Sequence, residues 1–348
     1  MISLCMIVKN EEENLEKCIN AAKKYVDEII IVDTGSDDST KEIAYKFTNY
    51  VYDFEWCNDF AKARNFSISK ANNDWILVID ADEIITDFNK ENVLNFIKHN
   101  DKVVGRIKRI NPFEDVTGVK KYIERVNRLF NKNYFRYEGI IHEQIVLQDD
   151  RNYSIENIGI SAEHIGYTQE VLNRTKKIER NINLLKKAIL DKNDDPYLYY
   201  QLGKSYYMNK EYEEACSNFT KALKLPINFM YEYVEDLVES YGYSLINTNR
   251  FSEALILGDY EKYYKNSADY NFLMGLICMN NAKFDFAVEY FSKCMEGKEG
   301  RIEGVNTYLP NYNIGVIFEC LGYKKEAVEF YKKCKGYKVA ENRLKELV

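Results

Sequence analysis

The chain has 348 residues, a length that favours about two domains, each large enough to bury a core without metal or disulfide crosslinks. Hydrophobic residues make up 46% and charged residues 30%, which excludes general disorder, and the net charge of −7 argues against charge-driven binding to nucleic acid. No apolar run approaches the roughly 20 residues that span a bilayer. Eight scattered cysteines without a CxxC pair are typical of a reduced, cytoplasmic protein.

Short β-type runs alternate with helical stretches from residue 1 to about 165. Residues 1–8 are apolar but have no basic leader, which predicts a first strand rather than a signal peptide. Helices are expected at 11–25, 41–47 and 60–71. Strands or β-rich segments are expected at 2–8, 28–33, 50–54, 75–79, 103–110, 123–130, 140–147 and 158–164.

Polar residues follow three of the predicted strands directly. Strands that are apolar on both faces and alternate with helices predict a parallel sheet covered by helices. In such sheets the binding crevice lies at the carboxyl ends of the strands. We therefore expect the side chains of Asn10, Asp33, Asp80 and Asp82 to converge there.

The period changes after a predicted linking helix at about 170–190. A glycine and an alanine then recur twelve positions apart, at Gly203/Ala215, Gly242/Ala254, Gly275/Ala287 and Gly315/Ala327. In three copies an aromatic residue follows the alanine by four positions: Phe219, Phe291 and Tyr331. The second copy departs, with Gly258 in that place. Small residues let paired helices approach closely, and the pattern resembles the tetratricopeptide repeat (TPR).

Asp80-Ala81-Asp82 at the end of an apolar strand is the most informative segment for chemistry. Two carboxylates that flank one small residue can share a hard divalent cation, and oxygen ligands suit Mg²⁺ or Mn²⁺. The alternative is a solvated acidic turn.

Two earlier segments give this motif a context. They are Met6-Ile-Val-Lys-Asn-Glu-Glu12 and Asp33-Thr-Gly-Ser-Asp-Asp-Ser-Thr40. Together with the later D-x-D, these segments resemble the opening of family 2 glycosyltransferases of GT-A fold. The resemblance implies a nucleotide-sugar-binding α/β domain that uses a UDP-sugar. By that resemblance the donor-binding residues are Val8, Asn10, Glu11, Asp33, Arg64, Asp80 and Ala81. An exposed surface arginine is the alternative for Arg64.

The same resemblance implies a metal site and a catalytic base. Asp82, Asp80 and His164 are the expected ligands of Mn²⁺ or Mg²⁺, although a lone histidine is often structural. Glu143 is the expected general base of an inverting transfer, with His142 as the next candidate. A structural Glu-His ion pair is the alternative at that site.

A local basic patch of five residues lies between the D-x-D and Glu143. They are Arg106, Lys108, Arg109, Arg125 and Arg128. Binding of phosphates or of an acidic acceptor is one interpretation, and a solvated β-face is the simpler one.

Together these features predict a GT-A glycosyltransferase domain at 1–168, a linking helix at 169–194 and TPR-like helical repeats at 195–348. This pairing resembles the TPR-bearing family 2 glycosyltransferases, which include the sublancin-type peptide S-glycosyltransferases. It implies transfer of a sugar with inversion to Cys or Ser of a peptide or protein acceptor. The alternatives are transfer to a cell-surface glycan, and a TPR scaffold whose transferase domain is inactive.

The first predicted repeat helix is rich in tyrosine. Its members are Tyr197, Tyr199, Tyr200, Tyr206 and Tyr207. Since one stripe must pack in the core, we expect the others to be exposed anchors of the kind found at interfaces. They would recruit the acceptor or pair two copies in a homodimer.

Overall fold

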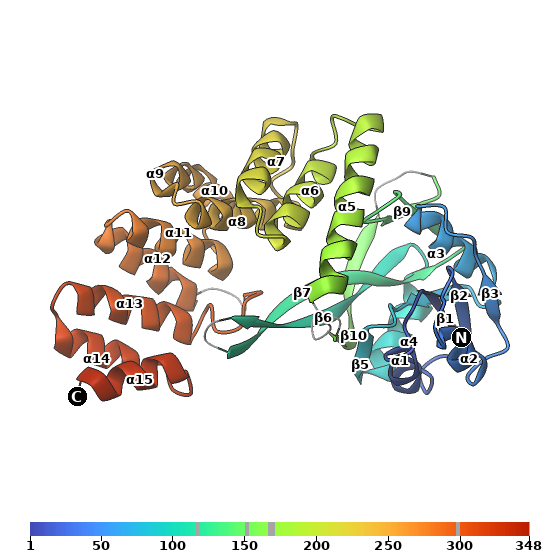
Figure 1. The fold of residues 1–348 in the computed structure, drawn as a ribbon. Coiled ribbons are helices and arrows are strands. Elements are labelled where there is room, and N and C mark those ends of the chain that lie inside the picture. The colour runs from blue at the N-terminus through green and yellow to red at the C-terminus, as the bar shows by residue number, and fades with distance from the viewer. Residues whose placement is uncertain (116–117, 150–152, 166–170, 297–299, 348) are drawn as a thin grey trace. The chain divides into compact units, whose positions relative to one another are not determined.

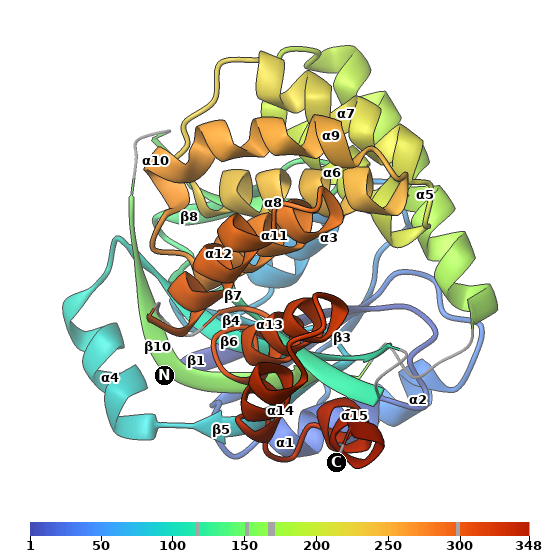
Figure 2. The ribbon, with the colours of Figure 1, turned by 90° about the vertical axis from the view of Figure 1, so that its left-hand side faces the viewer.

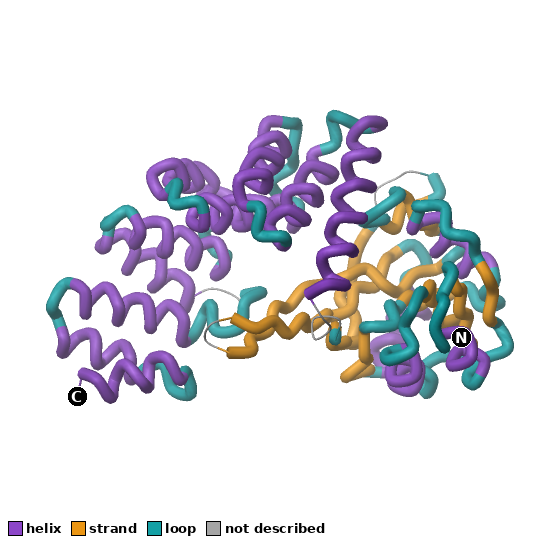
Figure 3. Tube along the Cα trace, viewed as in Figure 1, coloured by secondary structure: helices purple, strands orange, loops and turns teal. Residues whose placement is uncertain are grey.

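The computed structural model describes residues 1–115, 118–149, 153–165, 171–296 and 300–347. The chain divides into two compact units, one of Met1–Phe113 with Lys121–Glu170 and the other of Glu114–Lys120 with Val171–Val348. Strands occur in the N-terminal part of the chain, and the part that follows is helical (Figure 3). None of the helices in the described ranges is both long and apolar enough to cross a membrane.

The N-terminal unit is built on an eight-stranded sheet in the order β3-β2-β1-β4-β7-β6-β10-β5, with a separate two-stranded β8-β9 sheet. Figure 1 shows the strands of this unit together with the helices that pack on them. The strands are β1 Ile2–Val8, β2 Glu28–Asp33, β3 Val51–Asp53, β4 Trp75–Val78, β5 Glu83–Phe88, β6 Val103–Asp115, β7 Gly118–Asn131, β8 Phe135–Glu138, β9 Gln144–Leu147 and β10 Ser154–His164.

The first four predicted strands, β1 to β4, pair in parallel as expected. Beyond them, where the sequence predicts β-rich segments without a direction, the sheet is mixed. β7 runs antiparallel to β4, and β10 pairs parallel with β6 but antiparallel with β5. Strands β6 and β7 are neighbours in the sheet, and only two residues separate them in sequence, far fewer than the crossover of a parallel pair requires.

Helices cover both faces of the sheet. They are α1 Leu15–Ala22, α2 Thr40–Tyr45, α3 Phe60–Ser69 and α4 Lys90–His99. Alternate residues of β1 point to opposite faces: Leu4 and Met6 pack in the cluster with α1, α2 and α4, and Cys5 packs in the cluster with α3 and β8–β9. The turned view shows α4 beside β10 at the edge of this unit (Figure 2).

Several elements differ from the predictions. Helix α1 begins at Leu15 rather than near residue 11, because the backbone of Glu11 first forms a turn that accepts from the amides of Asn14 and Leu15. Strand β9 begins at Gln144 rather than near 140, because Gly139 and His142 have positive φ angles of 102° and 49°. Strand β5 was not predicted.

The helical unit begins with α5 Val171–Asp191 and continues in helix pairs. These are α6 Pro196–Met208 with α7 Tyr212–Lys224, α8 Glu232–Asn247 with α9 Phe251–Ala254 and α10 Glu261–Tyr264, α11 Ala268–Asn280 with α12 Phe284–Glu296, and α13 Tyr308–Cys320 with α14 Lys324–Lys332, followed by α15 Lys338–Leu347. A 3₁₀ segment, Leu255–Tyr260, joins α9 to α10.

The predicted glycine–aromatic packing is confirmed. A Cβ added at Gly203, Gly275 or Gly315 would lie 2.5–2.6 Å from a ring atom of the aromatic residue expected beside it, Phe219, Phe291 or Tyr331. Where Gly258 replaces that aromatic residue, the second repeat has no continuous second helix but the short α9, the 3₁₀ segment and α10. Leu257 and Leu273 then fill the space beside Gly242.

The expectation of exposed tyrosine anchors on the first repeat helix is wrong. Tyr200 is buried, and the four other tyrosines of α6 are partly buried against the same core cluster. The ring of Tyr197 packs edge-on against that of Tyr233, and Tyr200 donates a hydrogen bond to Asp236. The tyrosine rings of α6 therefore pack in the core cluster that α6 shares with the next repeat.

Candidate functional site

The turn after β2 is organised by Asp33. Its Oδ1 accepts hydrogen bonds of 2.9 Å from the amides of Gly35 and Ser36. Gly35 has a φ of 104°, which favours glycine at this position. Oδ2 of Asp33 is buried and has no partner among the described residues. Asp33 therefore presents one unsatisfied acceptor at the carboxyl end of the sheet.

The turn after β1 is bonded to the turn after β2. Val8 lies opposite Asp33 in the β1–β2 register, and its carbonyl accepts from the Thr34 amide at 2.9 Å. Asn10, with a φ of 54°, accepts from the amide of Asp37 at 3.0 Å. The amide of Glu11 donates to Thr40 Oγ1 at 2.8 Å. These contacts hold the predicted donor-binding residues Val8, Asn10 and Glu11 beside Asp33.

Arg64 joins two of the predicted site residues. Its Nη2 donates to Oδ1 of Asp80 at 2.9 Å, and its Nε donates to Oε1 of Glu143. The Arg64 side chain is buried, so the alternative of an exposed surface arginine is wrong. Burial disfavours the charged form of Asp80, but the charges of Arg64 and Arg128 outweigh it and hold the pKa of that carboxyl well below its usual range.

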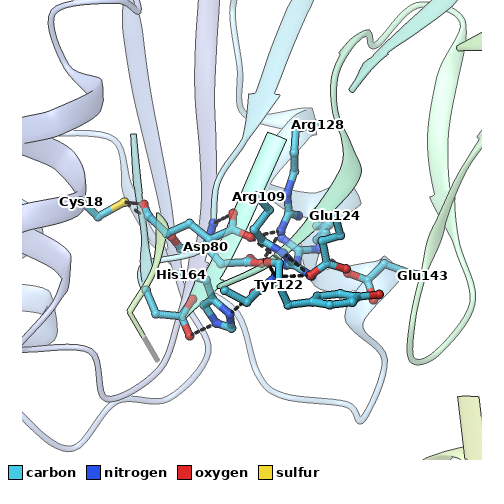
Figure 4. Close-up of polar contacts among 12 residues, drawn as sticks. Cys18, Asp80, Arg109, Tyr122, Glu124, Arg128, Glu143 and His164 are labelled. Atoms are coloured by element: carbon cyan, nitrogen blue, oxygen red, sulfur yellow. Dashed lines mark hydrogen bonds and ion pairs between the residues drawn. The ribbon is translucent and has the colours of Figure 1, made fainter. Parts of the chain in front are cut away.

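A chain of ion pairs runs from Asp80 across the sheet (Figure 4). Arg128 Nη2 lies 2.7 Å from Asp80 Oδ2 and 2.6 Å from Glu83 Oε1. Arg109 lies 2.9 Å from the same Glu83 oxygen and 2.8 Å from Glu124 Oε1. Glu83 is 0% exposed and Arg128 is 7% exposed, so a solvated β-face is the wrong interpretation for this part of the basic patch.

Asp82 and His164 contact each other beside this chain of ion pairs. His164 Nε2 is 3.1 Å from Asp82 Oδ2, and His164 Nδ1 is 2.9 Å from Asn111 Oδ1. Although the two residues are 82 positions apart in sequence, pairing of β10 with β5 brings them together, with His164 opposite Glu83 in register. Ala81 between the two aspartates is buried.

The predicted metal ligands do not form one cluster. Among the described residues no group of three or more His, Cys, Asp or Glu side chains is placed to hold a metal ion. Asp80 directs both carboxylate oxygens to arginines, whereas Asp82 and His164 face each other. The ligands that this geometry offers to a cation are one carboxylate oxygen of Asp82 and one imidazole nitrogen of His164.

His142 lies in the turn between β8 and β9, next to Glu143. Its Nε2 is buried and has no partner among the described residues. Burial lowers the pKa of His142 to about 4, against the opposing charge of Glu143. The ring is therefore neutral at neutral pH.

Sequence reasoning missed Glu83, Asn111 and Glu124 as parts of this site. Polar residues spaced by two on β6, Arg109 and Asn111, share one face of the strand. Glu124 on the neighbouring β7 carries the charge opposite to that of Arg109. Polar residues two positions apart on one β segment, with an opposite charge on the next β segment, are the signal that points to a cross-strand network.

We expect Arg128→Met to lower the free energy of unfolding of the N-terminal unit by about 3 kcal/mol. Removing one partner of a buried ion pair leaves the other charge poorly compensated, here on Glu83. Urea unfolding followed by tryptophan fluorescence reports on this unit, because both tryptophans, Trp56 and Trp75, belong to it.

Arg136→Met is the matched control for that variant. Arg136 pairs with Glu138 at a more exposed position, where ion pairs contribute about 1 kcal/mol or less. Equal losses in the two variants would contradict a stabilising role of the buried chain.

Comparisons with known proteins agree with the two-part organisation. Residues 3–146 match the family model "Glycosyl transferase family 2", and residues 196–225 and 310–338 match tetratricopeptide repeat models. A TPR repeat-containing protein of Synechococcus elongatus is 32% identical over 213 residues, which cover 58% of this chain and 51% of that protein. The chain thus spans about half the length of that relative.

Two further relatives match larger or different parts of the chain. The SPbeta prophage-derived glycosyltransferase SunS of Bacillus subtilis is 26% identical over 295 residues, which cover 80% of this chain and 67% of SunS. The crystal structure of YrrB, described as a TPR protein with an unusual peptide-binding site, matches with a TM-score of 0.41 and 23% identity, over 50% of this chain and 87% of YrrB.

Proposed function

Because the chain carries an N-terminal family 2 glycosyltransferase domain followed by tetratricopeptide repeats, we propose that it transfers a sugar from a UDP-sugar, with inversion, to Cys or Ser of a peptide or protein. The observation that carries this proposal is that Asn10, Asp33, Asp80 and Asp82 follow or end three neighbouring parallel strands, β1, β2 and β4, at their carboxyl ends. Open α/β sheets bind ligands at this edge.

Asp33 and the turn around it support the assignment of the nucleotide pocket. A buried carboxylate oxygen without a partner is costly unless a ligand or water satisfies it. The N3–H of the uracil base of UDP offers such a donor. Val8, Asn10 and Glu11, bonded to the same turn, would form the wall of that pocket.

Asp82 and His164 fit a divalent cation. A carboxylate oxygen and an imidazole nitrogen are both suitable ligands for Mn²⁺, and the 3.1 Å between them leaves both able to contact one ion. When bound there, Mn²⁺ or Mg²⁺ would offset the negative charge that develops on the departing UDP. In this proposal Asp80 belongs to the donor-binding set, held in place by Arg64 and Arg128 rather than acting as a metal ligand.

Glu143 is the proposed general base. It would take the proton of the acceptor thiol or hydroxyl as that group attacks the anomeric carbon. Arg64 orients the Glu143 carboxylate and connects it to Asp80. Nη1 of Arg64 and the hydroxyl of Tyr137 are buried without partners among the described residues, which leaves two donors for a bound polar group near the base.

The repeats support a peptide or protein as the acceptor. Stacked helix pairs form extended surfaces of the kind that bind another chain. The similarity to SunS over most of this chain, repeats included, favours an enzyme of the same general kind.

A screen for UDP release tests the proposal. The full chain would be incubated with common UDP-sugars and Mn²⁺, alone and with cysteine- or serine-containing peptides, and modified peptide would be detected by mass spectrometry. We expect one UDP-sugar to be turned over faster when peptide is present. Release of UDP without peptide modification would favour a glycan acceptor, and absence of UDP release with every donor would contradict the proposal.

A further inference from the structure

The side chain of Asn111 is held in one orientation by two acceptors. Asn111 is 5% exposed, and its Nδ2 donates to Glu124 Oε1 at 2.7 Å and to the carbonyl of Tyr122 at 3.3 Å. A carboxylate and a carbonyl only accept hydrogen bonds, so the amide nitrogen must face them. The amide oxygen of Asn111 therefore faces His164.

This orientation decides which nitrogen of His164 carries a hydrogen. Asn111 Oδ1 lies 2.9 Å from Nδ1 of His164 and can only accept, so Nδ1 must donate. In the neutral ring the lone pair then lies on Nε2, which points at Asp82 Oδ2 from 3.1 Å. Two acceptors that face each other at this distance repel unless a proton or a metal ion lies between them, and a metal ion takes the place of that proton when it binds both atoms.

Glu124, which holds the Asn111 amide, is itself held in place by Arg109. Glu124 accepts from Nε and Nη2 of Arg109 at 3.0 and 2.8 Å, and Arg109 also donates to the fully buried Glu83. The orientation of the Asn111 amide is thus determined by the ion-pair chain that crosses β6 and β7, and thermal rotation of the amide would break contacts on both sides.

We propose that Asn111 is a positioning residue that prepares His164 Nε2, together with Asp82, to bind a divalent cation. The inference rests on the metal dependence in the proposed function and adds a residue that does not itself touch the cation. Partners of the second ring nitrogen orient metal-binding histidines, and removing such a partner typically weakens metal affinity by about 10–100-fold.

Binding of Mn²⁺ to the full chain without UDP, measured by the electron paramagnetic resonance of the free ion, tests this role, because UDP would itself bind the ion. We expect Asn111→Leu to weaken Mn²⁺ binding by at least about 10-fold. Asn131→Leu is the matched control: Asn131 is also 5% exposed and lies on β7, but it pairs with Trp75 at the start of β4, away from Asp80. We expect its Mn²⁺ affinity to be that of the wild type.

A second readout reports on the ring itself. The chain has only three histidines, so ¹⁵N-histidine labelling gives few signals, and a His164→Gln variant assigns the one that matters. In the wild type we expect Nδ1 of His164 to carry a hydrogen-bonded proton, both with Mg²⁺ and without it. In Asn111→Leu we expect that hydrogen bond to be lost.

The outcomes separate the inference from the proposed function. An Nδ1 without hydrogen in the wild type, or an Asn111→Leu variant that binds Mn²⁺ as tightly as Asn131→Leu, would overturn the role of Asn111 alone. Failure of the wild type itself to bind Mn²⁺ would overturn the metal dependence of the proposed function, and the role of Asn111 with it.

Discussion

Replacing Asp82 with alanine should lower the rate of sugar transfer by about 10³-fold while the N-terminal unit stays folded. The reason is the loss of one of two side chains that would hold the cation against the leaving diphosphate, an electrostatic contribution of several kcal/mol to the transition state. UDP release in the presence of Mn²⁺ measures the effect. EDTA should inactivate the wild-type enzyme in the same assay.

Asp87→Ala is the control for that variant. Asp87 is an exposed carboxylate on β5, five residues from Asp82, and is not part of the ion-pair chain. Its removal should leave the rate within a factor of two of the wild type, which tests whether any loss of negative charge near this strand is harmful. Activity that persists in Asp82→Ala, or in EDTA, would rule out the proposed metal site.

Glu143→Gln should reduce kcat by roughly 10²–10⁴-fold for a hydroxyl acceptor, because the amide cannot take up the acceptor proton. The variant keeps the shape of the side chain, and its amide oxygen can still accept from Nε of Arg64, so the affinity for the donor should be unchanged. Steady-state kinetics with varied donor, together with a direct measurement of UDP binding, separate these two effects.

Glu138→Gln is the matched control for Glu143→Gln. Glu138 ends β8, lies in the same β8–β9 segment and is largely solvent-exposed, where it pairs with Arg136. We expect near wild-type kcat for this variant. If Glu143→Gln behaves in the same way, the base lies elsewhere, and the neutral His142 with its unpartnered Nε2 becomes the residue to substitute next.

Local patterns in the sequence were sufficient for many elements of this protein. The apolar run of β2, Glu28–Asp33, was predicted with its observed bounds, since a strand buried on both faces is recognisable from its composition alone. The twelve-residue glycine–alanine spacing identified the helix pairs for the same reason: a glycine that faces an aromatic ring within one hairpin depends on residues close in sequence. The resemblance of the first 82 residues to a known family came from such short segments as well.

Only the tertiary structure decided how distant residues combine. The sequence did not show that β5 exists, that β10 joins the sheet between β6 and β5, or that His164 therefore meets Asp82. It also did not show that Arg128 is buried and Arg109 partly buried, since an arginine on a β-strand has the same local pattern whether it faces water or a carboxylate on the next strand. The sequence determined which segments become most of the strands and helices, because those preferences depend on neighbouring residues. The pairing of strands depends on contacts between residues tens of positions apart, and local periodicity in the sequence does not report such contacts. The charge network of the candidate site follows from that pairing, so only the tertiary structure decided it.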